Sequence, residues 1–334
     1  MFESLSNETL IEIFKNLNHT ELLKVSEVSK RFYDNATDSN LWKNFDINIS
    51  QPLDEKIRLL KLSRFQKLKT LRLTDDFGSG VNNEIFQILM KIDLEELTLF
   101  RLNFESIDKV LLANVISKTK DVNLSIPENL GEDKVQEIME KIPCGGIQRL
   151  SLFEFNCLGV DPRTVGRAIN SLKHFHGEIS IFEERQVMET LEEMSKETNL
   201  KSVIIESSHK LPARILSKAL NNLEDLTLYS NSFNSFTSEQ MVEFFYEMSH
   251  QTKLQKIDFR YLSDCRDHLE SVPGNILARA ICKLKVFYAP HLRFSDCQIK
   301  SIFQRIATQD PRTTRELDLG SCQKPLNLSK KGGF

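Results

Sequence analysis

The chain has 334 residues, of which 40% are hydrophobic and 27% are charged, and its formal net charge is −3. This length predicts about two domains, and the composition is typical of a folded protein rather than a disordered one. The small negative charge excludes a globally basic nucleic-acid-binding protein. No run of about 18 apolar residues is present, so no membrane span is predicted.

The N-terminus, MFESLSNETL, has acidic and polar residues where a signal peptide needs a basic start and an apolar stretch. Glycosylation sequons begin at Asn7, Asn18, Asn35, Asn48, Asn123 and Asn327. Several of them fall on faces that are expected to pack, where a secreted protein would not easily tolerate a sugar. We therefore expect a cytoplasmic and/or nuclear protein.

The first 45 residues predict three short helices. Ser4 or Ser6 can cap the first, whose apolar residues recur at the spacing of one helical face: Leu10, Ile13, Phe14 and Leu17. Thr20 can cap the second helix, which carries Leu22, Leu23, Val25 and Val28. The third leads from Ser29 towards a Leu41-Trp42 pair. Helices of this length are not stable alone in water, so their apolar faces must pack against each other or against a partner.

The order of these residues resembles an F-box, whose pattern is roughly LPxExLxxIxxxL, then DL, VSKxW and LW. The matching positions run from Phe2 to Phe45: Leu5, Glu8, Leu10, Ile13, Leu17, Leu22, Val28-Ser29-Lys30, Phe32 and Leu41-Trp42. Three positions depart from the pattern: Ser6 stands where the family has Pro, Glu21 where it has Asp, and Phe32 where it has Trp.

The resemblance implies a docking module for a Skp-type adaptor, which links F-box proteins to a cullin-RING ubiquitin ligase. The implied adaptor-binding residues are Leu5, Leu10, Ile13, Phe14, Leu17, Leu22 and Val28. Each of them can equally well hold the three helices together. We expect Leu5, Phe14 and Leu22 to point outward, and Phe14→Ala to weaken adaptor binding by about 2 kcal/mol if Phe14 is a hot spot.

The rest of the chain repeats the pattern L-x-x-L-x-L. Clear copies begin at Leu68, Leu94, Ile147, Leu200, Leu223 and Leu254. Weaker copies begin at Trp42, Thr119, Leu172, Leu284 and Thr314. Successive copies are between 23 residues (Leu200 to Leu223) and 31 residues (Leu223 to Leu254) apart. Leucine-rich repeats have a period of about 20–29 residues, with one strand and one helix in each.

Helical stretches separate these copies, so strands and helices alternate. The predicted fold is an α/β leucine-rich-repeat horseshoe solenoid preceded by a small three-helix F-box domain, and the chain resembles the leucine-rich-repeat class of F-box proteins. The predicted domains are an F-box at 1–46, about ten irregular repeats at 47–328 and a frayed tail at 329–334. Because the copy at Trp42 ends the head, we expect the head and the repeats to be rigidly joined.

The positions between the leucines should line the concave strand face. Five side chains there are of the types enriched in binding hot spots, and we expect them to bind a target protein: Phe100, Phe153, Tyr229, Arg260 and Tyr288. The alternative is that the aromatic residues cover neighbouring strands or pack under a loop.

No catalytic, metal or cofactor site is predicted. The six cysteines (Cys144, Cys157, Cys265, Cys282, Cys297 and Cys322) are too scattered for zinc or redox motifs and are expected to be core residues. His174 and His176 lack a third ligand nearby in sequence, and the GSG at 78–80 lacks the rest of a phosphate loop. The segment 264–268 carries Cys, Asp and His without a nucleophile motif.

Three functions stay open. The chain can be the non-catalytic substrate receptor of an SCF-type ubiquitin ligase, an adaptor-bound scaffold without a ubiquitylation role, or a free leucine-rich-repeat interaction protein resembling an inhibitor. An enzyme is a distant fourth. The expected partners are the adaptor with its cullin-RING ligase and an unknown target protein, without nucleic acid or membrane. Co-purification with the adaptor separates the third function from the first two.

Overall fold

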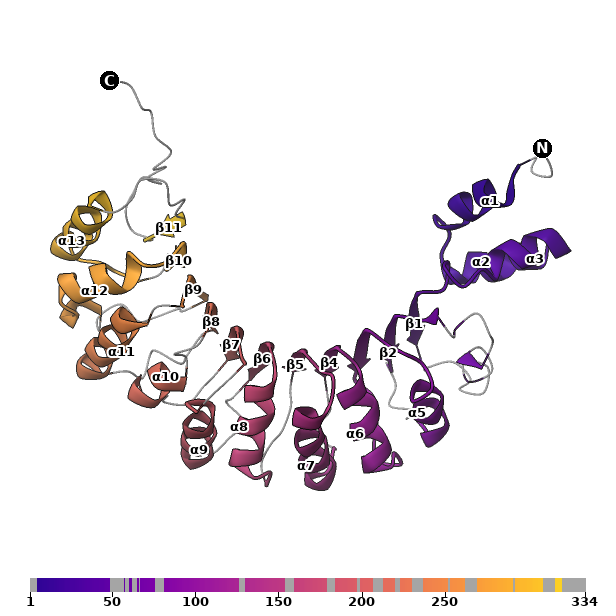
Figure 1. The fold of residues 1–334 in the computed structure, drawn as a ribbon, viewed down its shortest axis with the longest axis horizontal. Helices are drawn as coiled ribbons and strands as arrows, with labels where there is room; N and C mark the ends of the chain where they lie inside the picture. The colour runs from indigo at the N-terminus through magenta and orange to yellow at the C-terminus, as the bar shows by residue number, and fades with distance from the viewer. Residues whose placement is uncertain are drawn as a thin grey trace, which may run out of the picture. The chain divides into compact units, whose positions relative to one another are not determined.

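The structure, a computed structural model, describes residues 5–48, 57, 60–61, 65, 67–75, 81–125, 130–153, 159–178, 184–196, 199–206, 213–219, 223–229, 237–251, 253–261, 269–290, 292–308 and 316–319. The chain forms two compact units, Met1–Phe155 and Asn156–Phe334. Within each unit, parallel strands alternate with helices, and the helices lie on one side of the strands (Figure 1).

The first unit begins with three short helices, α1 (Asn7–Phe14), α2 (His19–Ser26) and α3 (Lys30–Ala36). Ser6 and Ser29 cap α1 and α3 by accepting hydrogen bonds from backbone N–H groups. The cap of α2 is Asn18, which forms a capping box with Glu21, so the prediction that Thr20 caps this helix is wrong. Asn18 is the more favourable cap because its amide oxygen and the Glu21 carboxylate together satisfy two backbone N–H donors.

The head joins the repeats through an aromatic cluster. Trp42 is fully buried, and its indole Nε1 donates a 2.7 Å hydrogen bond to the Ala36 carbonyl oxygen. Its ring centroid lies 5.2 Å from that of His19 and 5.3 Å from that of Phe65. Phe45, the first buried residue of the adjoining strand, lies 4.6 Å from His19 and 4.7 Å from Phe65. Packing, and not only the covalent chain, therefore connects the head with the first repeat.

Five parallel strands of the first unit follow in chain order: β1 (Asn44–Asn48), β2 (Thr70–Thr74), β3 (Glu96–Phe100), β4 (Asp121–Ser125) and β5 (Arg149–Phe153). Between them lie α5 (Asn83–Leu89), α6 (Lys109–Lys118), α7 (Glu132–Lys141) and the 3₁₀ turn η3 (Ile142–Cys144). The weak copy at Thr119 fits because its buried hydroxyl donates to the Val115 carbonyl oxygen at 3.0 Å.

The second unit has six parallel strands: β6 (His174–Glu178), β7 (Ser202–Glu206), β8 (Asp225–Tyr229), β9 (Lys256–Tyr261), β10 (Val286–Tyr288) and β11 (Glu316–Asp318). Its helices are α8 (Pro162–Ser171), α9 (Glu184–Met194), α10 (Ala213–Ala219), α11 (Ser238–His250), α12 (Gly274–Ile281) and α13 (Asp296–Ala307), with a 3₁₀ turn η5 at Leu269–Ser271. Gly177 stands at a leucine position because the Phe175 ring fills the space of its missing side chain.

The predicted repeat is confirmed in both units. Every predicted copy of L-x-x-L-x-L coincides with one of the strands, and within each unit equivalent residues of neighbouring strands pair in register, apart from a shift near the ends of β8 and β9. In β2 and β3 the leucines are buried while the residues between them are partly exposed. This alternation is expected of a strand with one face against a helical layer. The fold is therefore α/β, with a three-helix head and parallel leucine-rich repeats.

Lysines of one repeat satisfy carbonyl groups at a helix end in the repeat before it. Lys118 Nζ donates to the carbonyl oxygens of Met90 and Ile92, at 3.0 and 3.2 Å, just beyond α5. Lys283 Nζ donates in the same way to the Ser249 carbonyl oxygen and, at 3.3 Å, to that of Gln251. The last carbonyls of a helix lack intrahelical partners, and a cation there also interacts favourably with the negative end of the helix dipole.

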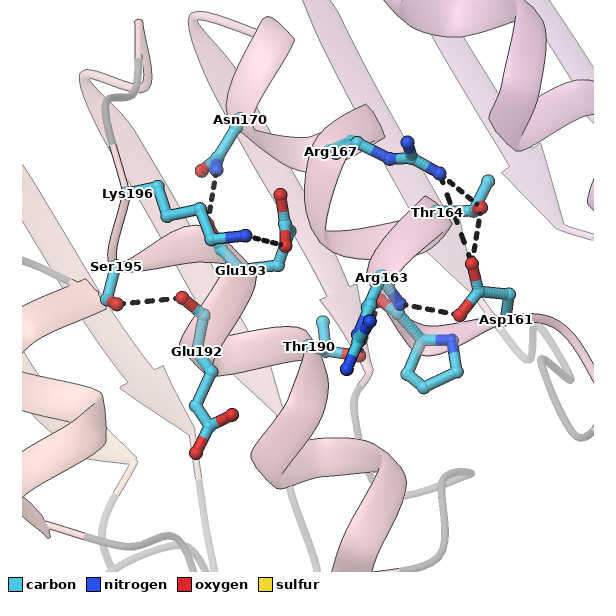
Figure 2. Close-up of polar contacts among 11 residues, drawn as sticks. Asp161, Arg163, Thr164, Arg167, Asn170, Thr190, Glu192, Glu193, Ser195 and Lys196 are labelled. Carbon is cyan, nitrogen blue, oxygen red and sulfur yellow. Dashed lines mark hydrogen bonds and ion pairs between the residues drawn. The ribbon is translucent and has the colours of Figure 1, made fainter.

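Helices α8 and α9 are joined by polar contacts and a close approach (Figure 2). Asn170 Nδ2 donates to the Glu193 carbonyl oxygen at 2.8 Å, and Thr190 Oγ1 donates to the Pro162 carbonyl oxygen at 3.2 Å. A Cβ atom at Gly166 would lie 2.5 Å from Glu193 Cβ. The polar groups of this cluster are taken up by contacts between two neighbouring repeats. This indicates a structural role for the cluster.

Two predictions about the chain's organisation have different outcomes. Among the described cysteines, Cys282 is buried as predicted, but Cys144 and Cys297 are exposed, so the core assignment is wrong for those two. Cys144 lies at the end of η3 and Cys297 lies in the first turn of α13, and no packing layer covers either side chain.

The predicted domain boundaries stay a prediction. The boundary after residue 46 falls inside β1, and the tail at 329–334 lies outside the described residues.

Candidate protein-interaction surfaces

The head contains the predicted adaptor-binding residues, and the structure divides them by burial. Ile13 and Val28 are exposed, at 38% and 66%, and Leu5 and Leu17 are half-buried. Leu10, Phe14 and Leu22 are buried, at 1%, 4% and 1%. The binding role itself stays a prediction for all seven.

The expectation that Phe14 and Leu22 point outward is wrong in this structure. Phe14 packs against Phe32, with ring centroids 5.7 Å apart, and both Phe14 and Leu22 belong to the apolar interior of the head. A small three-helix head has few core positions, so the helices bury their largest apolar groups against each other. Phe14→Ala would consequently destabilise the head and is not a clean test of docking.

Apolar exposure is concentrated in the head. Large apolar side chains that are exposed among the described residues are Ile13, Val28, Tyr33, Val110, Phe153 and Tyr246. Half of these six lie on α1, just after α2 and on α3, although the head is a small part of the chain. Tyr33, at 53% exposure, was missed in the sequence because it falls outside the F-box pattern. Clustered exposed apolar groups mark interaction surfaces more often than scattered ones do.

Each departure from the F-box pattern has a structural use in this chain. Ser6 accepts a hydrogen bond from the Thr9 backbone N–H at 3.2 Å, so it caps α1 where the pattern has proline. Glu21 accepts one from the Asn18 backbone N–H at 2.8 Å. Phe32 supplies the ring that packs on Phe14. The substitutions therefore preserve helix starts and core packing.

His19, the first residue of α2, was not singled out in the sequence. Its ring helps to join the head to β1, because it contacts Trp42 and Phe45. Burial lowers the pKa of His19 below its ordinary value, and this outweighs the opposing effects of a hydrogen bond with the Asn44 backbone and of the Asp46 carboxylate. The folded state therefore favours the neutral imidazole.

The stability of the head should fall as the pH is lowered through the window that begins at the ordinary histidine pKa of about 6.5 and ends at the lower folded-state value. In this window the unfolded chain binds a proton that the folded chain does not bind. We expect the Tm of His19→Gln to fall less between pH 7.5 and 5.5 than the Tm of the wild type. Thermal unfolding followed by circular dichroism measures this, with His250→Gln as the control, and equal pH dependence in the wild type and His19→Gln would contradict the prediction.

The strand face of the first unit carries two of the predicted target-binding residues. Phe153 is 40% exposed and Phe100 is half-buried. Both occupy the last position of their strands, with Ser125 of β4 between them in register. The Arg101 guanidinium carbon lies 5.1 Å from the centre of the Phe100 ring, and Arg101 has a positive φ of 55° at the end of β3. The first unit therefore presents aromatic rings and an arginine at one edge of its strand face.

The strand face of the second unit carries the other three predicted residues. Tyr288 is half-buried at the end of β10, next to Asp258 of β9 in register. For Tyr229 and Arg260 the structure describes only the backbone. A register shift between β8 and β9 pairs Tyr229 with Tyr261. Arg260 is therefore not the residue paired with Tyr229, because a bulge adds one residue to β9 before this position.

No metal-binding cluster of three or more His, Cys, Asp or Glu residues occurs in the part of the chain that the structure describes. His174 and His176 share one face of β6, at alternate positions of the strand. The segments 78–80 and 264–268 lie outside the described residues. None of the helices that the structure describes is long and apolar enough to span a bilayer.

Comparisons with known proteins agree with this architecture at the head. A family model described as F-box-like matches residues 2–48. Among solved structures, the chain is similar to the leucine-rich repeat-containing protein LegL7 from Legionella pneumophila, with a TM-score of 0.46, 13% sequence identity, and coverage of 81% of this chain and 95% of that chain. No curated protein matches the chain in sequence. The chain therefore has an F-box-like domain over residues 2–48, and parallel leucine-rich repeats follow it.

Proposed function

We propose that the chain is the substrate-recognition subunit of an SCF-type ubiquitin ligase, in which the head binds a Skp-type adaptor and the strand face binds a target protein. The observation that carries the proposal is the coincidence of the F-box-like match at residues 2–48 with the concentration of exposed apolar side chains in the same segment. F-box domains in general bind adaptors of this type. The head would then be the domain that binds the adaptor.

In this role the chain itself makes and breaks no bonds. A receptor that holds a target beside a recruited conjugating enzyme raises the effective concentration of the target's lysines. The repeats suit that task because successive strands present a continuous row of side chains. We propose Phe100 and Phe153 of the first unit, and Tyr229, Arg260 and Tyr288 of the second unit, as target-binding residues. The corresponding location is the cytoplasm or the nucleus.

Adaptor docking is tested with the double variant Ile13→Asp/Val28→Asp. Both side chains are exposed, so the fold should tolerate the change, whereas a carboxylate buried in an apolar interface is costly. We expect adaptor binding to weaken by about 2 kcal/mol, roughly 30-fold in Kd, for a lost hot spot. Isothermal titration calorimetry of the full chain with purified adaptor measures the effect.

Val110→Asp is the matched control for this titration. Val110 is also exposed, at 42%, but it lies on α6 and outside the head. Its variant should bind the adaptor as the wild type does. If the full chain shows no binding to the adaptor, the receptor and the adaptor-bound scaffold both fail and a free repeat protein is left.

The ubiquitylation role needs a separate experiment. Proximity labelling in cells with the proteasome inhibited would identify proteins held by the repeats. Blocking the cullin should then lengthen the lifetime of such a target. If the labelled partners keep the same lifetime when the cullin is blocked, the chain is a scaffold and not a ligase receptor.

A further inference from the structure

Four basic side chains gather at one edge of the last repeats of the second unit. Arg279 is in the last turn of α12, Lys283 follows that helix, Lys285 precedes β10, and Arg305 is in the last turn of α13. Helix ends and the starts of the following strands share an edge in a parallel repeat. Helices α12 and α13 pack together, since Cys282 Sγ donates to the Ile302 carbonyl oxygen at 3.6 Å. We call these four residues the cationic edge.

In other repeats, two lysines just before a strand are paired with carboxylates, whereas Lys43 and Lys120 at the same position form no ion pair among the described residues. Lys69 Nζ lies 3.2 Å from a Glu95 oxygen, and Lys201 Nζ lies 3.1 Å from a Glu224 oxygen. Each pair joins equivalent positions of neighbouring repeats. Lys285 occupies the same repeat position as these two lysines, but Gln255 and Arg315 stand at that position in the repeats on either side of it. Neither neighbour of Lys285 at this position is a carboxylate.

The two arginines of the cationic edge are free to bind. Among the described residues, neither the Arg279 nor the Arg305 side chain makes a hydrogen bond or an ion pair, and Arg305 is exposed. Lys283 is held in place by the carbonyl groups after α11. Burial and the charges of Arg279 and Arg305 lower the pKa of Lys283, which shows that these like charges act on one another. Such repulsion destabilises the unliganded chain and would be relieved by an anion.

The helix dipole explains part of this arrangement but not all of it. A cation in a last helical turn is stabilising by itself, and Arg279 and Arg305 both have that position. At the end of α9, by contrast, the cation is paired with a carboxylate: Lys196, which follows the helix, forms an ion pair with Glu193 at 2.5 Å. The fold thus accepts paired cations at a helix end. None of the four cations of the cationic edge forms an ion pair within the part of the chain that the structure describes.

We propose that the cationic edge, formed by Arg279, Lys283, Lys285 and Arg305, binds an acidic segment of a partner protein. Guanidinium groups match carboxylates in bidentate pairs, which gives the contact geometry as well as charge. The net charge of the chain is −3, so attraction to an acidic partner arises from this local group and not from the whole molecule. A nucleic acid is disfavoured, since specific binding commonly neutralises about six to ten phosphates. This surface lies outside the strand face and the head, so it goes beyond the function proposed above.

The experiment uses the full chain and a fluorescein-labelled peptide of about ten Asp, Glu and Gly residues, with binding followed by fluorescence anisotropy. We expect Arg279→Gln/Arg305→Gln to weaken peptide binding by about tenfold or more, as for loss of interfacial charge pairs. A peptide with Asn and Gln in place of Asp and Glu should not bind. Binding should also weaken between about 50 and 300 mM salt, because the ions screen exposed charges.

Lys201→Gln is the matched control, since Lys201 lies on the same edge but is already paired with Glu224. It should bind the acidic peptide as the wild type does. The proposal is overturned if the double arginine variant binds as tightly as the wild type, if Lys201→Gln loses as much affinity, or if a single-stranded oligonucleotide of equal charge binds more tightly than the peptide.

Two further checks separate this proposal from other failures. Neither arginine side chain makes a hydrogen bond or an ion pair among the described residues, so the double variant should keep a Tm close to that of the wild type, and Arg305→Glu provides a second variant with a larger expected loss. Adaptor docking takes place on the head, so both variants should retain it. Loss of peptide binding with adaptor binding intact supports the cationic edge independently of the ligase role.

Discussion

Trp42→Ala should lower the free energy of unfolding of the first unit by about 4 kcal/mol, the range found for removing a large buried aromatic side chain. Trp42 is fully buried and contacts the rings of His19, Phe45 and Phe65. The substitution also leaves the buried Ala36 carbonyl oxygen without the indole N–H. Because this cluster joins the head to β1, the loss should affect both parts together.

Urea denaturation followed by far-ultraviolet circular dichroism measures this change, since Trp42 is the only tryptophan and its fluorescence disappears in the variant. Tyr33→Ala is the control, because Tyr33 is an exposed aromatic residue of the same head. It should change the free energy of unfolding by no more than about 0.5 kcal/mol, as exposed substitutions usually do. A Trp42→Ala midpoint equal to that of the wild type would show that the cluster does not hold the head and the first repeat together.

Gly145→Ala should destabilise the first unit by about 2 kcal/mol, within the range for inserting a methyl group where no space exists. A Cβ atom at residue 145 would lie 2.2 Å from the Ser117 carbonyl oxygen and 2.7 Å from Ser117 Cβ. The backbone is fixed at this place, because Gly146 N donates to the same Ser117 oxygen at 2.8 Å. Relief therefore requires the turn after η3 to move away from the end of α6.

The neighbouring glycine supplies the matched control for this substitution. A Cβ atom at Gly146 would have the Lys118 carbonyl oxygen as its nearest neighbour, at 3.7 Å, which is an ordinary van der Waals distance. Gly146→Ala should therefore be nearly neutral. Chemical denaturation of the two variants side by side measures the difference, and equal midpoints for Gly145→Ala and Gly146→Ala would refute the steric argument.

The three proposed interaction surfaces are exposed for different structural reasons. On the head, Ile13 and Val28 are exposed because the core of a small three-helix unit is already filled by Leu10, Phe14 and Leu22. On the repeats, exposure of Phe153 follows from its strand position. The cationic edge depends on a third feature, the placement of basic residues at the ends of α12 and α13 and just before β10. Variants of the three surfaces can therefore be studied independently.

The spacing of apolar residues is enough to predict the register of the repeats and the existence of the head. Leucine spacing is a local property: neighbouring repeats differ little in length, so equivalent residues such as Leu71, Leu97 and Val122 pair in adjacent strands. Alternation within a strand then fixes which residues are buried. The F-box pattern likewise follows from the local spacing of helical residues, and it located the head correctly.

Which apolar residues of the head are exposed to a partner depends on how its three helices pack. Helical periodicity gives one apolar face, but it does not distinguish a face that packs inward from one that a partner covers. Phe14 and Leu22 were therefore assigned to the wrong side, and Tyr33 was missed. The bulge that places Tyr261 opposite Tyr229 was equally hidden, because an inserted strand residue leaves the leucine spacing before it unchanged.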